Sequence, residues 1–158
     1  MSDNHPMTPA GLESLRARLH RMLTVDRPEV ITLIEEARAH GDLSENAEYD
    51  AAKNKQGILE ARIADLKNRA ATAQVIDPTT IQEDKVVFGA TVTVMDLDND
   101  YQRTYQIIGD HEADLKNGRI SIASPLSRAL IGKKEGEFVD FEAPGGNREL
   151  EILKIEYK

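Results

Sequence analysis

The chain has 158 residues, no cysteine and a formal net charge of −8 at pH 7. Without cysteine it has no disulfides, no thiolate catalysis and no cysteine-based zinc site. The negative charge argues against a general nucleic-acid coat protein, which needs a basic surface to release counterions from phosphates. Three Phe, four Tyr and no Trp argue against an aromatic stacking surface for single strands and against an aromatic-lined small-molecule pocket.

No apolar stretch approaches the roughly 20 residues that a membrane span needs. Residues 1–7, MSDNHPM, have neither the basic start nor the apolar core of a secretory signal. We therefore expect a cytoplasmic protein that makes no contact with a membrane.

Residues 8–40 have a helical hydrophobic pattern. Thr8 suits the N-cap and Pro9 the first helical position. The apolar residues that follow are Leu12, Leu15, Leu19 and Met22, and then Val30, Leu33 and Ala37. The second group continues the first only if Leu23 replaces Met22, which is a slip of one residue. Because a proline nitrogen cannot donate to the preceding turn, we expect a kink or break at Pro28.

A second helix is predicted from about Glu45 to Gln74. Its apolar stripe consists of Ala52, Leu59, Ile63, Leu66, Ala70 and Ala73. Two stripes joined by a short polar connection bury their apolar faces against each other, which predicts an antiparallel coiled-coil hairpin over residues 1–77. Arms of ~33 residues at ~1.5 Å per residue give a hairpin roughly 50 Å long, with residues 41–45 at its tip.

The hydrophobic period changes to two in the second half of the chain. Five segments rich in Val, Ile, Thr, Tyr and Phe are predicted as strands, at 90–96, 101–109, 119–124, 137–143 and 149–157. A short helix is predicted at 124–132, between Ser124 and Gly132. Residues 78–158 therefore form a small α+β domain with an antiparallel sheet, joined to the hairpin by a hinge at 75–80. The predicted fold class of the whole chain is α+β.

The sequence HGDLSENAEYD, residues 40–50, contains four carboxylates and no Lys or Arg. The carboxylates are Asp42, Glu45, Glu48 and Asp50. Asp42 and Glu45 have the spacing of a capping box that starts the second helix. Two carboxylates on a tight bend also make half of a site for Mg²⁺, which prefers oxygen ligands and keeps several waters. The residues alone leave both interpretations open, and the two are compatible.

The sequence resembles the bacterial transcript cleavage factors of the Gre family, and the GreA branch more than the more basic GreB branch. The resemblance is carried by EEARAHGDLSENAEYDAAKNKQG, AQVIDPT, VVFGATVTVMDLD, YQIIGDHEAD and ISIASPLSRALIGKKEGE, in the expected order. It implies a coiled coil that enters the secondary channel of bacterial RNA polymerase, followed by an FKBP-like domain that docks at the channel entrance. It also implies that the protein stimulates the polymerase to cleave backtracked RNA by hydrolysis, with no nuclease activity of its own.

The resemblance assigns the catalytic role to Asp42 and Glu45, which would help to hold a Mg²⁺ ion completed by the polymerase. The chain alone should bind this ion weakly, because two carboxylates fill only part of an octahedral shell. The other partner is the nascent RNA 3′ end of a backtracked complex, and no small-molecule substrate is expected.

Residues beside the acidic pair have suitable chemistry for supporting roles. Asn46 suits hydrogen bonding to a ligand or water, and Tyr49 suits stacking on an extruded base or packing across the hairpin. Arg38 and Lys53 flank the tip and suit contacts with RNA phosphate.

Ser124 and Pro125 begin the element that we expect to dock on the polymerase. The FKBP-like resemblance also raises prolyl isomerisation, which needs aromatic walls around the proline. Phe88, Phe138 and Phe141 instead have the pattern of alternating strand core, so isomerase activity is not expected.

Two other functions remain open. One is a regulator that occupies the secondary channel without stimulating cleavage, and the other is a coiled-coil holdase chaperone. The Asp-x-x-Glu pair in the setting GDLSENAEY favours cleavage, and substitutions in this pair would separate the three functions.

Overall fold

The computed structural model describes residues 4–41 and 46–158. Residue contacts divide the chain into two compact units. One unit is Glu13–Thr72, and the other combines Met1–Leu12 with Ala73–Lys158. The sequence predicts the domain boundary at residue 77. In the structure, the segment that ends at Leu12 and residues 73–77 belong to the unit that contains the sheet. No helix in the described part of the chain is long and apolar enough to cross a membrane.

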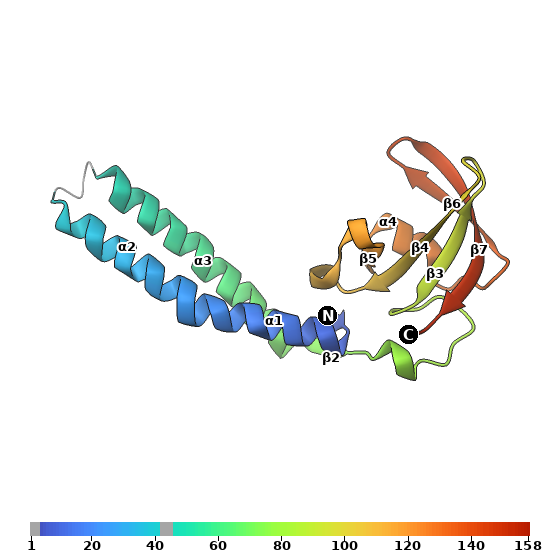
Figure 1. Ribbon diagram of the computed structural model, residues 1–158, viewed down its shortest axis with the longest axis horizontal. Helices are drawn as coiled ribbons and strands as arrows, with labels where there is room; N and C mark the ends of the chain where they lie inside the picture. The colour runs from blue at the N-terminus through green and yellow to red at the C-terminus, as the bar shows by residue number, and fades with distance from the viewer. Residues whose placement is uncertain (1–3, 42–45) are drawn as a thin grey trace. The chain divides into compact units, whose positions relative to one another are not determined.

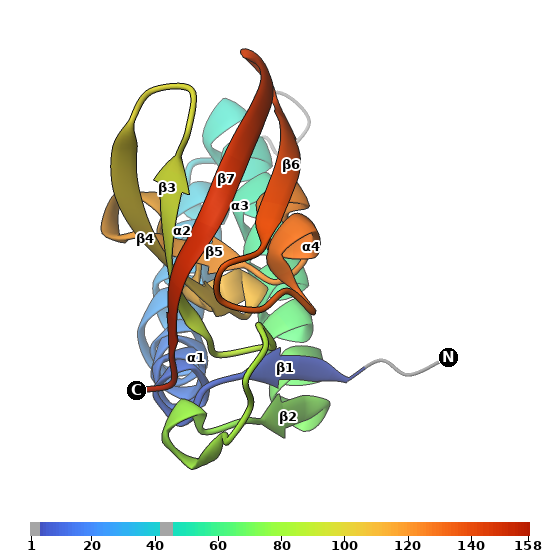
Figure 2. The ribbon, with the colours of Figure 1, turned by 90° about the vertical axis from the view of Figure 1, so that its right-hand side faces the viewer.

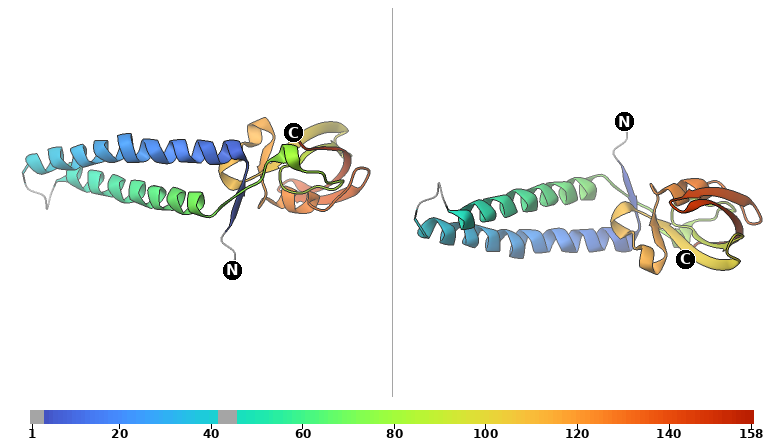
Figure 3. Two further views of the ribbon diagram at one scale, coloured as in Figure 1. Left: turned by 90° about the horizontal axis from the view of Figure 1, so that it is seen from below. Right: turned by 90° about the horizontal axis from the view of Figure 1, so that it is seen from above.

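The first half of the chain is a helical hairpin, drawn from blue to green in Figure 1. Its first arm consists of α1 (Pro9–Arg21), a π-helical segment (Met22–Asp26) and α2 (Arg27–Ala39). Its second arm is α3 (Ala47–Ala71). α2 and α3 pack side by side along their length, as Figure 3 shows in two views.

The π-helical segment explains the one-residue slip in the hydrophobic stripe. A π turn closes hydrogen bonds over five residues and so inserts one extra residue into an α-helix. The predicted disturbance therefore lies at Met22–Asp26, which ends two residues before Pro28. Pro28 sits in the first turn of α2, where its missing N–H is tolerated.

The hairpin seam differs from the prediction at one position. Val30, Ile34 and Ala37 are buried on α2, whereas Leu33, the predicted seam residue, is 40% exposed. On an ideal helix Leu33 and Ile34 both lie about 50° from the direction midway between Val30 and Ala37, so the spacing alone does not distinguish them. On α3, Ala52, Ile63 and Leu66 are buried as predicted.

The second half contains a five-stranded sheet with the strand order β5-β4-β3-β7-β6. Its strands are β3 (Thr91–Asp96), β4 (Tyr101–Ile108), β5 (Arg119–Ser121), β6 (Phe138–Ala143) and β7 (Gly146–Glu156). The helix α4 (Pro125–Leu130) lies between β5 and β6 in sequence. All five predicted strands and the predicted short helix are confirmed. The sheet is antiparallel except for the parallel β4–β5 pair, a departure from the predicted sheet.

One face of this sheet holds the core. The buried residues include Val92, Val94, Ile107, Leu130, Val139, Leu150 and Ile152. They follow the period of two along each strand, which places alternate side chains on the same face. Figure 2 shows β3, β4, β6 and β7 as a curled sheet.

A short parallel pair was missed by the sequence analysis. β1 (His5–Met7) pairs with β2 (Ala73–Val75). The second helix therefore ends at Ala71 and not at Gln74. Both strands have only three residues, and β1 contains Pro6. Proline within a strand is typical of a sheet edge and weakens the sequence pattern from which a strand is predicted.

A buried carboxylate holds the start of α1 in this unit. The Glu112 side chain is 4% exposed and accepts hydrogen bonds from the backbone N–H of Thr8 at 3.0 Å and from the Thr8 hydroxyl. The Gly11 N–H donates to Thr8 Oγ1 at 3.1 Å, so Thr8 is the N-cap as predicted. A Cβ on Gly11 would lie 2.2 Å from Cδ of Glu112, so this close approach requires glycine.

Candidate functional site at the helical connection

The predicted metal pair falls in the connection between two paired helices. α2 ends at Ala39 with His40 as its C-cap, and α3 begins at Ala47. Asp42 and Glu45 themselves lie outside the described residues. The site is therefore described from the residues on either side of the pair, at the end of α2 and at the start of α3.

Asn46 fixes the start of α3. Its side-chain oxygen accepts from the Tyr49 N–H at 3.1 Å, and its side-chain nitrogen donates to the Ala37 carbonyl on α2 at 2.6 Å. Asn46 is therefore the N-cap of α3, and the predicted capping box with Asp42 as N-cap is wrong. The one side-chain amide of Asn46 thus caps α3 and binds the end of α2.

Tyr49 is half-buried and packs against the cluster of Val30, Ile34 and Ala52. This contact corresponds to the packing interpretation of Tyr49. The ring closes the hydrophobic seam at the end nearest the connection.

The other two carboxylates of the acidic stretch have local roles. Glu48 and Asp50 lie in the first turn of α3, where the helix dipole favours negative charge. Glu48 Oε2 also lies 3.3 Å from Nε2 of His40, with both side chains exposed. Among the described residues, no three His, Asp or Glu side chains gather as a metal site.

The predicted RNA-contacting residues lie on the two arms. Arg38 on α2 and Lys53 on α3 are both exposed. Lys53 Nζ donates to Oε1 of Gln56 at 3.1 Å, an exposed contact that costs little to exchange for another ligand.

The predicted docking residues begin α4. Ser124 is the N-cap, and its hydroxyl oxygen accepts from the Ser127 N–H at 3.2 Å. Pro125 follows in the first turn and is exposed. The Ser124 side chain thus shapes the helix start, and Pro125 is the part of this pair available at the surface.

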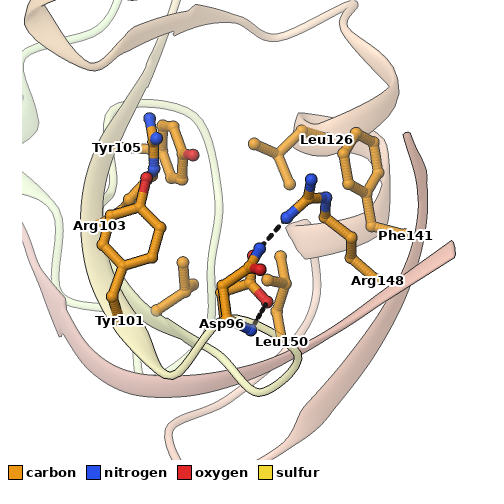
Figure 4. A pocket seen from close by; sticks show the side chains of 10 residues that line it. Asp96, Tyr101, Arg103, Tyr105, Leu126, Phe141, Arg148 and Leu150 are labelled. Atoms are coloured by element: carbon orange, nitrogen blue, oxygen red, sulfur yellow. Dashed lines mark hydrogen bonds and ion pairs between the residues drawn. The ribbon is translucent and has the colours of Figure 1, made fainter. Parts of the chain in front are cut away.

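A pocket that the sequence analysis did not foresee lies on the core face of the sheet, beside α4 (Figure 4). It has a volume of about 260 Å³ and is lined by Val94, Asp96, Asn99, Tyr101, Arg103, Tyr105, Leu126, Phe141, Arg148 and Leu150. Three aromatic rings line this pocket, whereas the low number of aromatic residues argued against an aromatic-lined pocket. The alternation of Tyr101, Arg103 and Tyr105 along β4 was the signal that could have revealed it.

The predicted core role of the three Phe residues holds only in part. Phe88 is 7% exposed, and Phe141 packs partly buried against the core. Phe138 is 56% exposed and is not a core residue. It is the first residue of β6, and the alternation places Val139 and not Phe138 on the buried face.

Asp96 is the most strongly bonded charge of this pocket. Its carboxylate accepts from the N–H groups of Asp98 and Asn99, from the Asn99 side chain, and from Nη1 of Arg148 at 2.8 Å. Burial alone would raise the pKa of Asp96, but the donors from Arg148, Asn99 and Asp98 outweigh it, and the pKa lies below its ordinary value.

Comparison with known proteins matches both halves of the chain. Residues 5–75 match the family model described as transcription elongation factor, N-terminal, and residues 81–157 match the one described as transcription elongation factor, GreA/GreB, C-term. The chain is similar to transcription elongation factor GreA of Caulobacter vibrioides, with 57% identity over 96% of this chain and 97% of the relative. It is also similar to GreA of Neisseria meningitidis, with 52% identity over 96% of this chain and 97% of the relative.

Among solved structures, the chain is similar to that of the transcription factor Gfh1. The identity is 26%, the coverage is 98% of this chain and 99% of the other, and the TM-score is 0.48. The two family models and the high identities over nearly the whole length establish the relationship from sequence. The chain belongs to the GreA/GreB family of transcription elongation factors.

Proposed function

We propose that this elongation factor stimulates hydrolytic cleavage of RNA in backtracked complexes of bacterial RNA polymerase. In this proposal the helical hairpin enters the secondary channel and brings Asp42 and Glu45 to the extruded RNA 3′ end. The protein is then an accessory factor, and the polymerase provides the rest of the active site. Two points support the proposal: the pair stands in the sequence between the end of α2 and the start of α3, and the chain belongs to a family of elongation factors.

The donor chemistry of the pair suits Mg²⁺. Two carboxylates supply the hard oxygen ligands that this ion prefers, and the remaining positions are left to polymerase and substrate. When bound, Mg²⁺ would lower the pKa of an attacking water and stabilise the leaving oxygen. The two carboxylates would bind the ion jointly with the polymerase, and their negative charge would favour its retention beside the RNA.

The residues that follow the acidic pair are fixed within the hairpin. Asn46 binds α3 to α2 immediately after the acidic pair, and Tyr49 packs into the seam one turn later. Because rotation of Asn46 or Tyr49 would break these contacts, the start of α3 is held against α2. Asn46 and Tyr49 thus support the tip from within the hairpin.

Arg38 and Lys53 would contact RNA phosphate, since both are exposed cations close in sequence to the connection. Pro125, presented by the cap that Ser124 makes, would contact the polymerase surface. Neither role requires a base-specific contact, which fits a factor that acts on RNA of any sequence.

The test is cleavage of a stalled, backtracked polymerase complex. The double variant Asp42→Asn and Glu45→Gln should lose stimulation by about 100-fold or more, as expected when metal-binding carboxylates are neutralised, while its affinity for the polymerase stays close to that of the parent. Asp50→Asn, which neutralises an exposed carboxylate in the first turn of α3, is the matched control and should stimulate cleavage as the parent does. Stimulation of cleavage by the double variant to the parental rate would refute the proposed role.

The same variants separate the alternatives. A channel-occupying regulator without cleavage activity would affect elongation equally with and without the two substitutions. A holdase would show activity in the absence of polymerase.

A further inference from the structure

The pocket beside α4 combines apolar walls with an excess of positive charge. Val94, Leu126 and Leu150 provide aliphatic contacts, and Tyr101, Tyr105 and Phe141 provide aromatic ones. The strand register explains why they converge. Val94 pairs with Arg103, and Phe141 pairs with Arg148, so these side chains lie on one face of the sheet.

Two guanidinium groups face this cavity, one on each side of it (Figure 4). Arg148 uses Nη1 to bind Asp96, and a guanidinium has five N–H donors in all, so donors remain for a ligand. The Arg103 guanidinium lies 4.8 Å from the centre of the Tyr101 ring, which holds it against the wall of the pocket. Within residues 4–41 and 46–158, no acidic side chain pairs with Arg103.

The side chains that line the pocket carry a net positive charge, whereas the second half of the chain is net negative. Residues 78–158 contain 10 basic and 15 acidic side chains. Asp96 is the one carboxylate among the lining residues, and four donors already bind it. Asp96 neutralises Arg148, and no carboxylate of the lining residues neutralises Arg103. An anionic group bound in the pocket would therefore balance the charge of Arg103.

The size of the pocket limits its occupant. A volume of about 260 Å³ lies just below the usual range of ligand sites, roughly 300–1,000 Å³. It accepts one ring or a branched aliphatic group with a short polar extension. Aromatic walls with a few converging polar groups are the usual composition of a small-molecule site.

We propose that this pocket binds a small carboxylic acid with one aromatic or branched aliphatic group. The apolar group would enter between Tyr101, Tyr105 and Phe141, and the carboxylate would bind Arg103 and the remaining donors of Arg148. This site is distinct from the acidic connection of the hairpin, and the proposal does not depend on RNA cleavage.

The test is a titration of the full chain with 3-phenylpropionate, followed by two-dimensional ¹H–¹⁵N NMR. Saturable shifts should cluster on β3, β4, α4, β6 and β7, with a dissociation constant on the order of 1 mM, as expected for about eleven ligand atoms. The neutral amide 3-phenylpropionamide should bind about 10-fold more weakly, because it lacks the charge-assisted hydrogen bonds. Acetate, which has the charge without the ring, should give no saturation in the same range.

Matched arginine variants test the assignment of the charge. Arg103→Gln should weaken 3-phenylpropionate binding about 10-fold, whereas Arg128→Gln, at an exposed position of α4 outside the pocket, should leave it unchanged. The spectrum of each free variant shows whether the sheet remains folded.

Three results would overturn the proposal. The first is the absence of saturable shifts with 3-phenylpropionate, and the second is equal affinity for the acid and the amide. The third is binding of the peptide acetyl-Asp-Phe-amide more than about 10-fold tighter than the free acid, which would assign the pocket to a protein segment.

Discussion

At the scale of single residues, the close contact of Gly11 with the buried Glu112 side chain makes this position sensitive to substitution. Gly11 lies in the first turn of α1, where a Cβ would meet the Glu112 carboxylate. Gly57 lies within α3, where a Cβ would meet nothing within 4 Å. Both glycines lie in helices, but an added Cβ would clash with another side chain only at Gly11.

Gly11→Ala should therefore destabilise the protein by about 2 kcal/mol, because the Glu112 side chain must move from the donors of Thr8. Gly57→Ala should stabilise it by about 1 kcal/mol through helix propensity. Urea unfolding followed by circular dichroism measures both changes. Equal effects of the two substitutions would contradict the close packing of Glu112 against α1.

Asp96 predicts a pH dependence at the same scale. Its pKa is lowered in the folded protein from the ordinary value of 3.8, so the carboxylate contributes stability above that pH. The contribution is lost as pH falls through the lower folded pKa, because the unfolded state then binds the proton more readily.

Unfolding by urea at a series of pH values between about 2 and 6 measures this contribution. Asp96→Asn should flatten the loss of stability on the acid side of about pH 4. Asp140→Asn, at an exposed position of β6, is the control and should keep the parental slope. An unchanged slope in Asp96→Asn would show that its bonds with Arg148 and Asn99 contribute nothing to folding.

At the scale of elements, the π-helical segment compensates for the one-residue slip in the apolar stripe of the first arm. The segment Met22–Asp26 adds one residue between α1 and α2, so the stripe of α1 and the buried residues of α2 can share one line along the arm. Removing one residue from this segment should restore a regular helix with both halves of the seam in register. Removing one from α2 should rotate Ile34 and Ala37 by about 100° out of the seam.

Thr24 and Thr32 provide a matched pair for this prediction, because both are exposed and both hydroxyls donate to the carbonyl four residues earlier. With Pro28→Ala to remove the ring from the continuous helix, deletion of Thr24 should change stability by less than about 1 kcal/mol. Deletion of Thr32 should cost about 2–3 kcal/mol through lost burial of Ile34. Thermal unfolding measures both, and a reversed order would contradict the role of the π segment.

The sequence predicted these elements where its periodicity was unambiguous. The slip between Met22 and Leu23 was enough to locate the helix irregularity, because an inserted residue must shift the stripe. The choice between Leu33 and Ile34 was not predictable, since two adjacent apolar residues both suit the seam. The cap at Asn46 was missed because Asp42 also has capping chemistry, and only the observed start of α3 distinguishes them.

At the scale of the whole molecule, the period change from helical to alternating predicted an α+β chain with a hairpin followed by a sheet. It did not predict that β1 pairs with β2, because a parallel pair of three residues each joins segments almost 70 positions apart and has no local pattern. It also did not predict the pocket, which arises from β3, β4, β6, β7 and α4 together. Recognition of the family, in contrast, needed only short motifs in the right order.

The central functional claim concerns delivery of two carboxylates to a shared Mg²⁺ ion. The most direct measurement is the Mg²⁺ concentration that gives half-maximal RNA cleavage in a backtracked polymerase complex. Adding the protein should lower this concentration, whereas Asp42→Asn with Glu45→Gln should leave it at the value for polymerase alone. If the double variant lowers the Mg²⁺ requirement as far as the parent does, these carboxylates do not hold the ion, and the proposed mechanism is wrong.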